Sequence, residues 1–178
     1  MREFATEAFV LGLRNSREND RSVFLYTKDL VRVEAKVIGG RKILSKLSPH
    51  LDVLNLVDVR LIQKSKFTLA DVITKNRFLV VRKDFKKSSA ALSLLFLTNF
   101  LAPALMPDLP FWHHLSRAFK SGRVHIGLFL KLFGYDAASA YCESCRRKDV
   151  GYFYLEDQSF LCVRCGLKFP ENKVIFLG

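Results

Sequence analysis

The chain has 178 residues, of which 49% are hydrophobic and 12% are aromatic, so it can bury a core and is not a disordered tail. Its formal net charge is +12, and residues 1–87 hold 19 Lys and Arg against 10 Asp and Glu. A strongly basic N-terminal half favours a polyanionic partner, most often nucleic acid, over a charge that serves solubility alone.

The N-terminal part of the chain carries the patterns of short β-strands. The clearest is 31–38, where Val31, Val33, Ala35 and Val37 alternate with charged residues, as in a half-buried strand. Strands are predicted at 4–14, 21–28, 31–38, 51–64 and 67–74. Strands of this number and length fit a small β-barrel such as an oligonucleotide/oligosaccharide-binding (OB) fold. A β-sandwich is the alternative, because the pattern does not fix the strand order.

The middle of the chain changes to helical patterns. Helices are predicted from a Ser88-Ser89 cap to Ala102, from an Asp108 cap to Ser121, and from Arg123 to Phe133. Residues 88–107 carry no charge, which resembles a membrane span. The helix within them is only about 15 residues long and contains Ser, Thr and Asn, so we expect a buried core helix and no membrane contact.

All four cysteines lie near the C-terminus, in the pattern Cys142-x2-Cys145 and Cys162-x2-Cys165. This spacing is typical of a tetrahedral four-thiolate zinc site, with a hairpin between the two knuckles. Such a shell has no open position, so the predicted zinc is structural. Two disulfides or a thioredoxin-like redox site are the alternatives. A positive φ is expected at Gly166, the residue after the second pair, which makes Arg146 after the first pair slightly unusual.

Catalytic motifs are absent from the sequence. The segment Gly39-Gly40-Arg41-Lys42 does not complete a nucleotide-binding P-loop, and there is no G-x-G-x-x-G or H-E-x-x-H. The four histidines, which are His50, His113, His114 and His125, do not have the spacing of metal ligands. The carboxylates are scattered along the chain. We therefore expect a protein that is not an enzyme. Glu3 and Glu7 interrupt the N-terminus, so no secretory signal is expected there.

Two basic segments are the candidate DNA-binding loops. Arg41, Lys42 and Lys46 lie in a loop without acidic residues, and Arg14, Arg17 and Arg21 flank the first predicted hairpin. Loop cations of an OB barrel can neutralise phosphates, although a solvated surface would have the same composition. Phe24, Tyr26 and Phe67 are candidates either for base stacking or for the core.

Several of these segments together resemble the RecO family of recombination mediators. The residues that carry the resemblance are Glu7-Ala-Phe-Val-Leu-Gly12, Arg17-Glu-Asn-Asp-Arg21, Gly39-Gly-Arg-Lys42 with Ser45-Lys-Leu47, and Leu132-Phe-Gly-Tyr135 ahead of Cys142-Glu-Ser-Cys145. The resemblance implies binding to single- and double-stranded DNA, strand annealing, and partnership with RecR and the single-stranded DNA-binding protein. It also implies an N-terminal OB fold, a helical domain and a zinc ribbon.

The expected chain is thus an α+β protein with an OB-fold barrel at 1–80, a helical domain at 81–138 and a four-cysteine zinc ribbon at 139–178. We expect it to be cytoplasmic and associated with the nucleoid. The alternative function is a zinc-ribbon module of transcription or translation that binds protein or RNA. A nuclease is disfavoured because no carboxylate cluster is displayed.

The helical part also offers a candidate docking site for the acidic tail of the single-stranded DNA-binding protein. The site would combine an apolar groove with a rim of Arg117, Lys120, Arg123 and Lys131. The groove would be formed by Leu94, Leu95, Phe96, Leu97, Phe100, Leu101, Phe111, Trp112, Phe119, Phe129 and Phe133. The alternative is that these apolar residues form the core and pack against the barrel.

Overall fold

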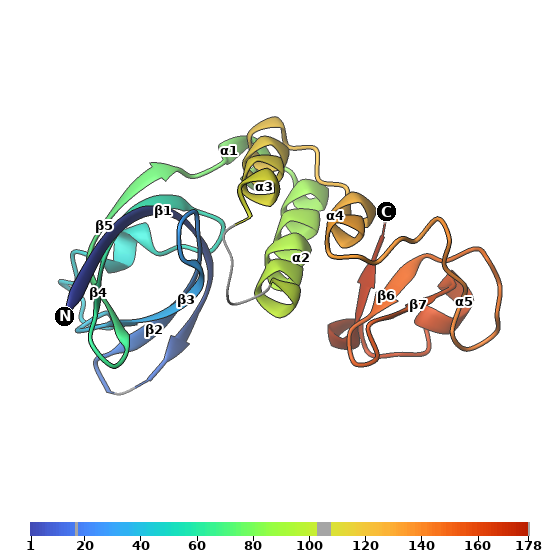
Figure 1. Cartoon of the computed structure of the whole chain (residues 1–178), viewed down its shortest axis with the longest axis horizontal. Helices are drawn as coiled ribbons and strands as arrows, with labels where there is room; N and C mark the ends of the chain where they lie inside the picture. Colours follow the sequence, from blue (N-terminus) through green and yellow to red (C-terminus); the bar gives the residue numbers. More distant parts are fainter. Residues whose placement is uncertain (17, 103–107, 178) are drawn as a thin grey trace. The chain divides into compact units, whose positions relative to one another are not determined.

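A computed structural model describes residues 1–16, 18–102 and 108–177. Within these residues the chain forms two compact units, Met1–Gly122 and Arg123–Gly178. Figure 1 shows the elements of both. The first unit contains a barrel and the helices α1, α2 and α3, and the second contains α4 and the cysteine module. The sequence predicted one helical domain at 81–138. In the structure, helices α1, α2 and α3 belong to the same compact unit as the barrel, and α4 belongs to the unit of the cysteine module.

The N-terminal strands close into a five-stranded barrel in the order β1-β2-β3-β5-β4 (Figure 1). The strands are β1 (Arg2–Asn15), β2 (Arg21–Thr27), β3 (Val31–Val37), β4 (Leu56–Gln63) and β5 (Phe67–Asn76). Neighbours pair antiparallel except β3 and β5, which pair parallel through Ala35–Phe67 and Lys36–Thr68. β1 pairs with β2 at one end and β4 at the other, which closes the sheet. This is the OB-fold barrel that the sequence predicted.

The barrel interior is filled by small and branched aliphatic side chains from all five strands. The buried set is Ala8, Val10, Val23, Leu25, Val33, Ala35, Val37, Leu51, Val57, Val59, Leu61, Leu69 and Val72. Along β3, burial alternates residue by residue, as the sequence pattern required. The fourth strand begins at Leu56 and not at Leu51, because Ser48–His50 forms a short 3-10 helix, η1, and Leu54 adopts φ +80°.

A second apolar cluster lies outside the barrel wall and binds a helix to it. Phe9 of β1 and Tyr26 of β2 are paired in register, and both are buried. The ring centroid of Phe9 lies 4.8 Å from that of Trp112 and 5.5 Å from that of Phe119. The ring centroids of Tyr26 and Phe111 are 5.4 Å apart. Because Phe111, Trp112 and Phe119 belong to α3 (Leu109–Ser121), this aromatic cluster fixes α3 on the barrel.

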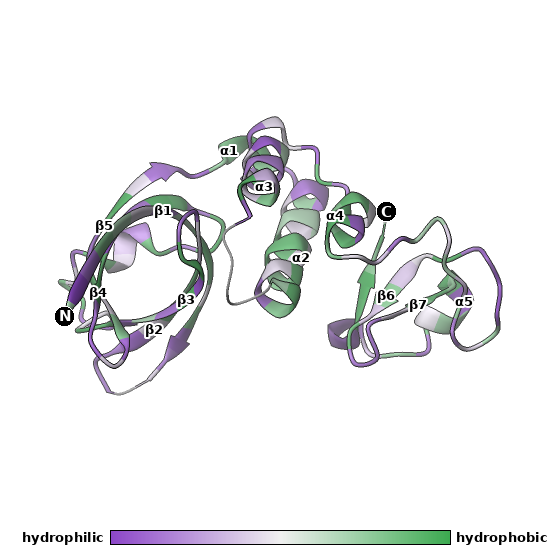
Figure 2. Ribbon diagram, in the orientation of Figure 1, coloured by the Kyte–Doolittle hydropathy of each residue, from purple (hydrophilic) through white to green (hydrophobic). Residues whose placement is uncertain are grey.

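The helices of the first unit are stabilised by side-chain caps. α3 begins and ends as predicted: the Asp108 carboxylate accepts a hydrogen bond from Phe111 N (2.8 Å), and Gly122 ends the helix at φ +68°. α2 (Phe85–Leu101) starts earlier than predicted, because Asp84 and not Ser88 is its N-cap, accepting from Lys87 N. Its second half is mostly hydrophobic (Figure 2).

The helix α1 (Leu79–Arg82) was not predicted, and Arg82 attaches it to the loop before β4 through the Val53 carbonyl and the Asn55 side chain. No helix among the described residues is long and apolar enough to cross a membrane.

The second unit begins with α4 (Ile126–Leu132), which is shorter than the predicted 123–133, and continues into a three-stranded sheet. The sheet order is β7-β6-β8, with β6 (Tyr152–Tyr154), β7 (Ser159–Leu161) and β8 (Val174–Phe176) all antiparallel. The predicted hairpin is β6–β7. The third strand was not predicted; it follows α5 (Val163–Gly166) and the 3-10 helix η2 (Glu171–Lys173). Phe153 is fully buried between Phe160 and Tyr135.

Candidate metal centre and nucleic-acid interface

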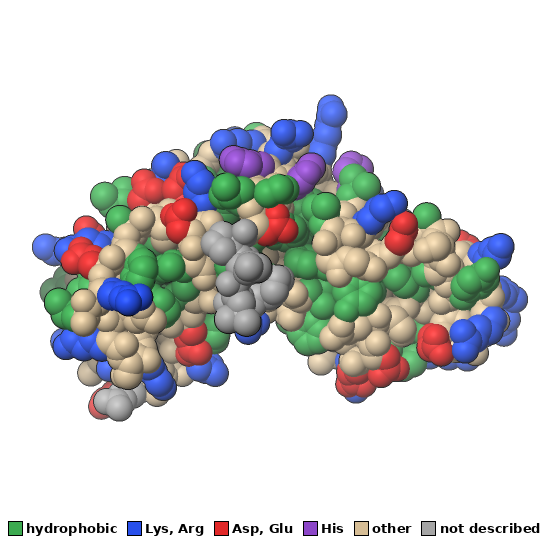
Figure 3. Space-filling model, viewed as in Figure 1, with side chains coloured by type: hydrophobic (Ala, Val, Ile, Leu, Met, Phe, Trp, Pro, Cys, Tyr) green, Lys and Arg blue, Asp and Glu red, His purple; other side chains and the backbone are tan. Residues whose placement is uncertain are grey.

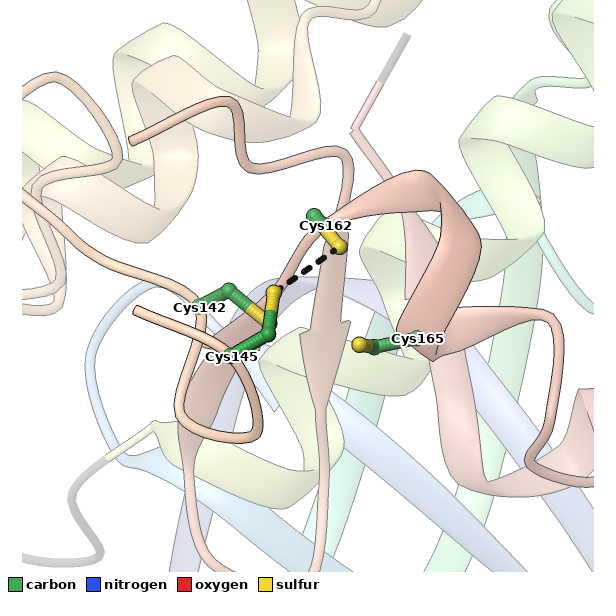
Figure 4. Close-up of side chains that lie close together, drawn as sticks. All are labelled: Cys142, Cys145, Cys162 and Cys165. Atoms are coloured by element: carbon green, nitrogen blue, oxygen red, sulfur yellow. Dashed lines mark hydrogen bonds between the residues drawn. The ribbon is translucent and has the colours of Figure 1, made fainter. Parts of the chain in front are cut away.

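The four cysteines converge at one point of the second unit. Their sulfur atoms all lie within 4.8 Å of one another, and Cys145 Sγ is 3.6 Å from Cys162 Sγ. Figure 4 shows the sulfurs of Cys162 and Cys165 turned toward those of Cys142 and Cys145. A tetrahedral ion with metal–sulfur bonds of about 2.3 Å separates its ligands by about 3.8 Å, so the donor set fits a four-thiolate metal site.

Each cysteine pair is held by the same backbone hydrogen bond. Arg146 N donates to Cys142 O and Gly166 N donates to Cys162 O, both at 2.8 Å. The first pair is also fastened to the sheet, because Glu143 N donates to Phe160 O at 2.9 Å. The two turns therefore place their thiols from fixed backbone positions, and the β6–β7 hairpin sets the distance between the turns.

The conformation after each pair differs from the expectation. Arg146 has φ +61°, whereas Gly166 ends the helical turn α5 without a positive φ. Glycine is required at 166 for space, since a Cβ there would lie 2.4 Å from the Tyr152 ring. The prediction of a positive φ at Gly166 was wrong, and the left-handed residue is Arg146.

The electrostatics of the thiol cluster favour a bound cation. Burial raises the pKa of Cys142, but backbone hydrogen bonds to Cys162 and Cys145, together with the Cys145 side chain, outweigh it and lower the pKa to about 6. The hydrogen bond to Cys162, burial and the neighbouring thiols raise the pKa of Cys165 to about 12. One thiolate thus opposes the ionisation of another, and a metal ion would remove that opposition. Among the described residues, no other group of His, Cys, Asp and Glu is arranged to hold an ion.

The two basic segments of the barrel are joined at one place. Gly39 N donates to the Asp20 carboxylate at 2.9 Å, and Arg41 N donates to Asn19 O at 3.0 Å. Lys36 also pairs with Asp20, at 2.9 Å. The loop after β3 and the turn between β1 and β2, which are about 20 residues apart in sequence, therefore form one surface.

The six predicted DNA-binding cations differ in exposure and in ion pairing. Arg41, Lys42 and Lys46 are exposed in the loop after β3. Arg14 is exposed but pairs with Glu34 at 2.7 Å, and Arg21 is half-buried at the start of β2. Arg17 lies outside the described residues. Figure 3 shows Lys and Arg side chains spread over the barrel among Asp and Glu, so the net charge alone does not locate a groove.

A pocket of about 580 Å³ on the barrel adds residues that sequence reasoning missed. It is lined by Arg14, Ser16, Ser22, Glu34, Lys36, Lys66, Phe67 and Thr68. Lys66 comes from the β4–β5 turn, and Lys36 comes from β3, where the sheet has only its short parallel pairing with β5. The signal was the Lys64-Ser65-Lys66 turn, because the β1–β2 and β4–β5 loops of an OB fold are the ones that contact oligonucleotides.

The three candidate stacking aromatics also separate. Tyr26 is 3% exposed and belongs to the aromatic cluster with α3, so it is a core residue. Phe67 lines the pocket and contacts Phe4, with ring centroids 6.0 Å apart. Phe24 is half-buried, and the Arg14 guanidinium lies 5.4 Å from its ring centre. Phe24 and Phe67 therefore keep part of their surface exposed, although Phe67 also packs against the barrel core.

The predicted docking groove is mostly core. Leu94, Leu95, Leu97, Phe111, Trp112, Phe119 and Phe129 are buried, and only Phe96 and Phe100 of that set are exposed large hydrophobics. Of the predicted rim, Arg117 and Lys120 line a surface pocket of about 520 Å³ on α3 together with His113. Lys, Arg and His side chains gather over α1 and α3 in Figure 3. Arg123 and Lys131 belong to the second unit, where Lys131 pairs with Asp136 at 2.9 Å.

Comparison with known families identifies the barrel. No curated protein gave a match to the chain. Residues 1–75 match the family model described as "Recombination protein O N terminal". These residues run from the start of the chain to the penultimate residue of β5, so the match covers all of the described barrel except the last residue of that strand. The barrel is therefore similar to the RecO N-terminal domain, which is of the OB-fold type.

Proposed function

We propose that this protein is a non-catalytic, DNA-binding mediator of recombinational repair. It binds single- and double-stranded DNA, promotes annealing of complementary strands, and loads a recombinase together with RecR and the single-stranded DNA-binding protein. The observation that carries the proposal is the joined pair of basic segments on a barrel that matches the RecO N-terminal domain.

The mechanism is electrostatic. Exposed Arg41, Lys42 and Lys46 stand in a stretch, 35–51, that contains no acidic residue. Their ammonium and guanidinium groups neutralise phosphates and release counterions, so binding requires no particular base sequence. Two strands held on such a surface repel each other less, and base pairing then supplies the specificity. No step of this mechanism needs a catalytic group.

The metal is proposed to be one structural zinc ion. Cys142, Cys145, Cys162 and Cys165 would hold the ion, and zinc would supply a cross-link between the two cysteine turns. The chain's own residues set the site: the backbone donors at 146 and 166 fix both turns, and β6–β7 joins them.

The proposal includes a contact between the helices of the first unit and the acidic tail of the single-stranded DNA-binding protein. The exposed Phe96–Phe100 pair, with ring centroids 6.3 Å apart, offers apolar surface, and Arg117 and Lys120 offer charge. A labelled tail peptide should bind at micromolar concentration, and Arg117→Glu with Lys120→Glu should weaken that binding. Absence of binding at low salt would rule out this docking site.

A strand-annealing assay tests the proposed function. The parent should accelerate the pairing of complementary oligonucleotides, with and without the single-stranded DNA-binding protein. Arg41→Ala with Lys42→Ala should slow it, whereas the matched control Lys83→Ala with Lys86→Ala, which removes two exposed lysines near α1 and α2, should not. A module of transcription or translation would instead bind RNA or protein and show no annealing.

A further inference from the structure

The tip of the basic loop is built as a hydrogen-bonded turn. Lys42 N donates to Gly39 O and Ser45 N donates to Lys42 O, each at 3.0 Å, so two turns follow one another. Ser48 fastens the loop by donating its hydroxyl to Gly40 O. Gly40 itself has no room for a side chain, since a Cβ would lie 2.9 Å from Val37 Cγ1. The loop therefore has a defined shape.

This turn carries apolar residues at its most exposed positions. Ile43 and Leu44 are the two central residues of the second turn, and they are 101% and 92% exposed. Turn centres normally take Gly, Asn, Asp, Ser or Pro, and a β-branched residue there gains nothing for the fold. Two adjacent, fully solvated aliphatic side chains on a turn of defined shape form a small apolar patch, and an apolar patch rimmed by polar residues can mark a contact with a partner.

The surroundings of the tip define the partner's charge. Arg41 and Lys42 precede the two aliphatic residues and Lys46 follows them, and all three cations are exposed. Arg41 is held against the β1–β2 turn through its backbone N–H. Two aliphatic side chains between cations fit a ligand in which an apolar surface lies between negatively charged groups.

We propose that Ile43 and Leu44 form an apolar wedge that inserts between neighbouring bases of bound DNA, while Arg41, Lys42 and Lys46 hold the flanking phosphates. This inference rests on the proposed DNA binding of the barrel and adds a second, uncharged contact to it. Insertion of Ile or Leu side chains between base steps unstacks and kinks DNA in other architectural proteins. For a strand-pairing protein, unstacked bases are more accessible to a complementary strand.

The size of the tip favours DNA over the other polyanionic partners. Two side chains match the gap opened at one base step. A stable protein–protein interface needs about 800 Å² from each partner, which two side chains do not provide. Binding to an anionic lipid surface normally uses a whole amphipathic face, and this loop offers a single turn.

The wedge is tested with DNA that contains 2-aminopurine, a base whose fluorescence rises when it is unstacked. The parent should brighten the probe on binding. Ile43→Ser with Leu44→Ser keeps every charge, so its affinity should have the parent's salt dependence but be roughly tenfold weaker, and the brightening should be lost. Ile73→Ser, at another exposed isoleucine of the barrel, is the matched control and should behave like the parent.

The outcomes separate the wedge from the proposed function. If the parent binds DNA and brightens the probe, and the serine double variant does the same, the wedge is overturned while DNA binding stands. If the parent does not bind DNA, both ideas are overturned. Loss of binding to phosphatidylcholine–phosphatidylserine vesicles in the double variant, with unchanged DNA binding, would overturn the wedge in favour of a lipid contact.

Discussion

The two units of this protein are stabilised in different ways. The first closes a barrel over thirteen buried aliphatic residues and adds an aromatic cluster that fixes α3. The second has three strands of three residues each. The buried cluster around its thiols consists of Cys142, Cys162 and Cys165 together with Tyr154 and Leu161. Apolar burial is sufficient to explain the first, whereas the second resembles small domains that need a metal to fold.

Removal of a metal ligand should give the largest effect. Cys165→Ser should abolish metal binding and unfold the second unit, because structural zinc in finger peptides binds with apparent free energies of about 10–16 kcal/mol. Native mass spectrometry would report the metal, and limited proteolysis would report which unit is cut. Ser144→Ala, an exposed residue within the first cysteine turn, is the control and should keep both.

A parent protein without bound metal would contradict the claim that the second unit needs a metal to fold. The claim also fails if Cys165→Ser retains both the metal and the parent's proteolysis pattern, because the second unit would then fold on its apolar contacts alone. Cleavage throughout residues 1–122 in the variant would mean that the first unit depends on the metal as well.

Loss of the aromatic cluster should give the next largest effect, confined to the first unit. Trp112 is 4% exposed and contacts both Phe9 and Tyr26. Trp112→Ala should lower the free energy of unfolding by about 3–5 kcal/mol, as measured by urea denaturation. Phe100→Ala, at an exposed ring, should change it by about 0.5 kcal/mol or less. Equal losses in the two variants would show that α3 is not fixed by this cluster.

The smallest effect concerns the ion pair between Glu7 of β1 and Lys75 of β5. A hydrogen bond from Lys75 lowers the pKa of Glu7 below its ordinary value of 4.5. Because the folded pKa is the lower one, the stabilisation is present above pH 4.5 and is lost as the pH falls through the folded value. Glu7→Gln should therefore be slightly less stable than the parent at pH 7, and the two unfolding curves should converge at acidic pH. A difference that persists below pH 3 would rule out this origin.

The sequence predicted elements wherever one local pattern dominates. Strict alternation defined β3, and Asp108 with Gly122 defined both ends of α3. It was wrong where a competing group lies nearby: Asp84, four residues before Ser88, caps α2. β8 was missed because three residues carry too short a pattern, and its pairing with β6 is a long-range contact.

The candidate sites divide in the same way. The four cysteines were predicted from spacing, and their sulfurs converge. The joining of Arg41 to Asn19 depends on barrel closure and could not be read locally, and neither could the place of Lys36 and Lys66 beside one pocket. Trp112 had two sequence interpretations, groove or core, and only its contacts with β1 and β2 decide for the core.

DNA binding by the barrel is tested most directly by the salt dependence of affinity for single-stranded DNA. The parent should show a log–log slope of about −3 to −4, as for four to six neutralised phosphates, and Arg41→Ala with Lys42→Ala should flatten it by about one to two. Lys83→Ala with Lys86→Ala removes the same charge elsewhere and should leave the slope unchanged. A loop variant with the parent's slope and affinity would contradict the assignment of the joined basic segments as the DNA-binding surface.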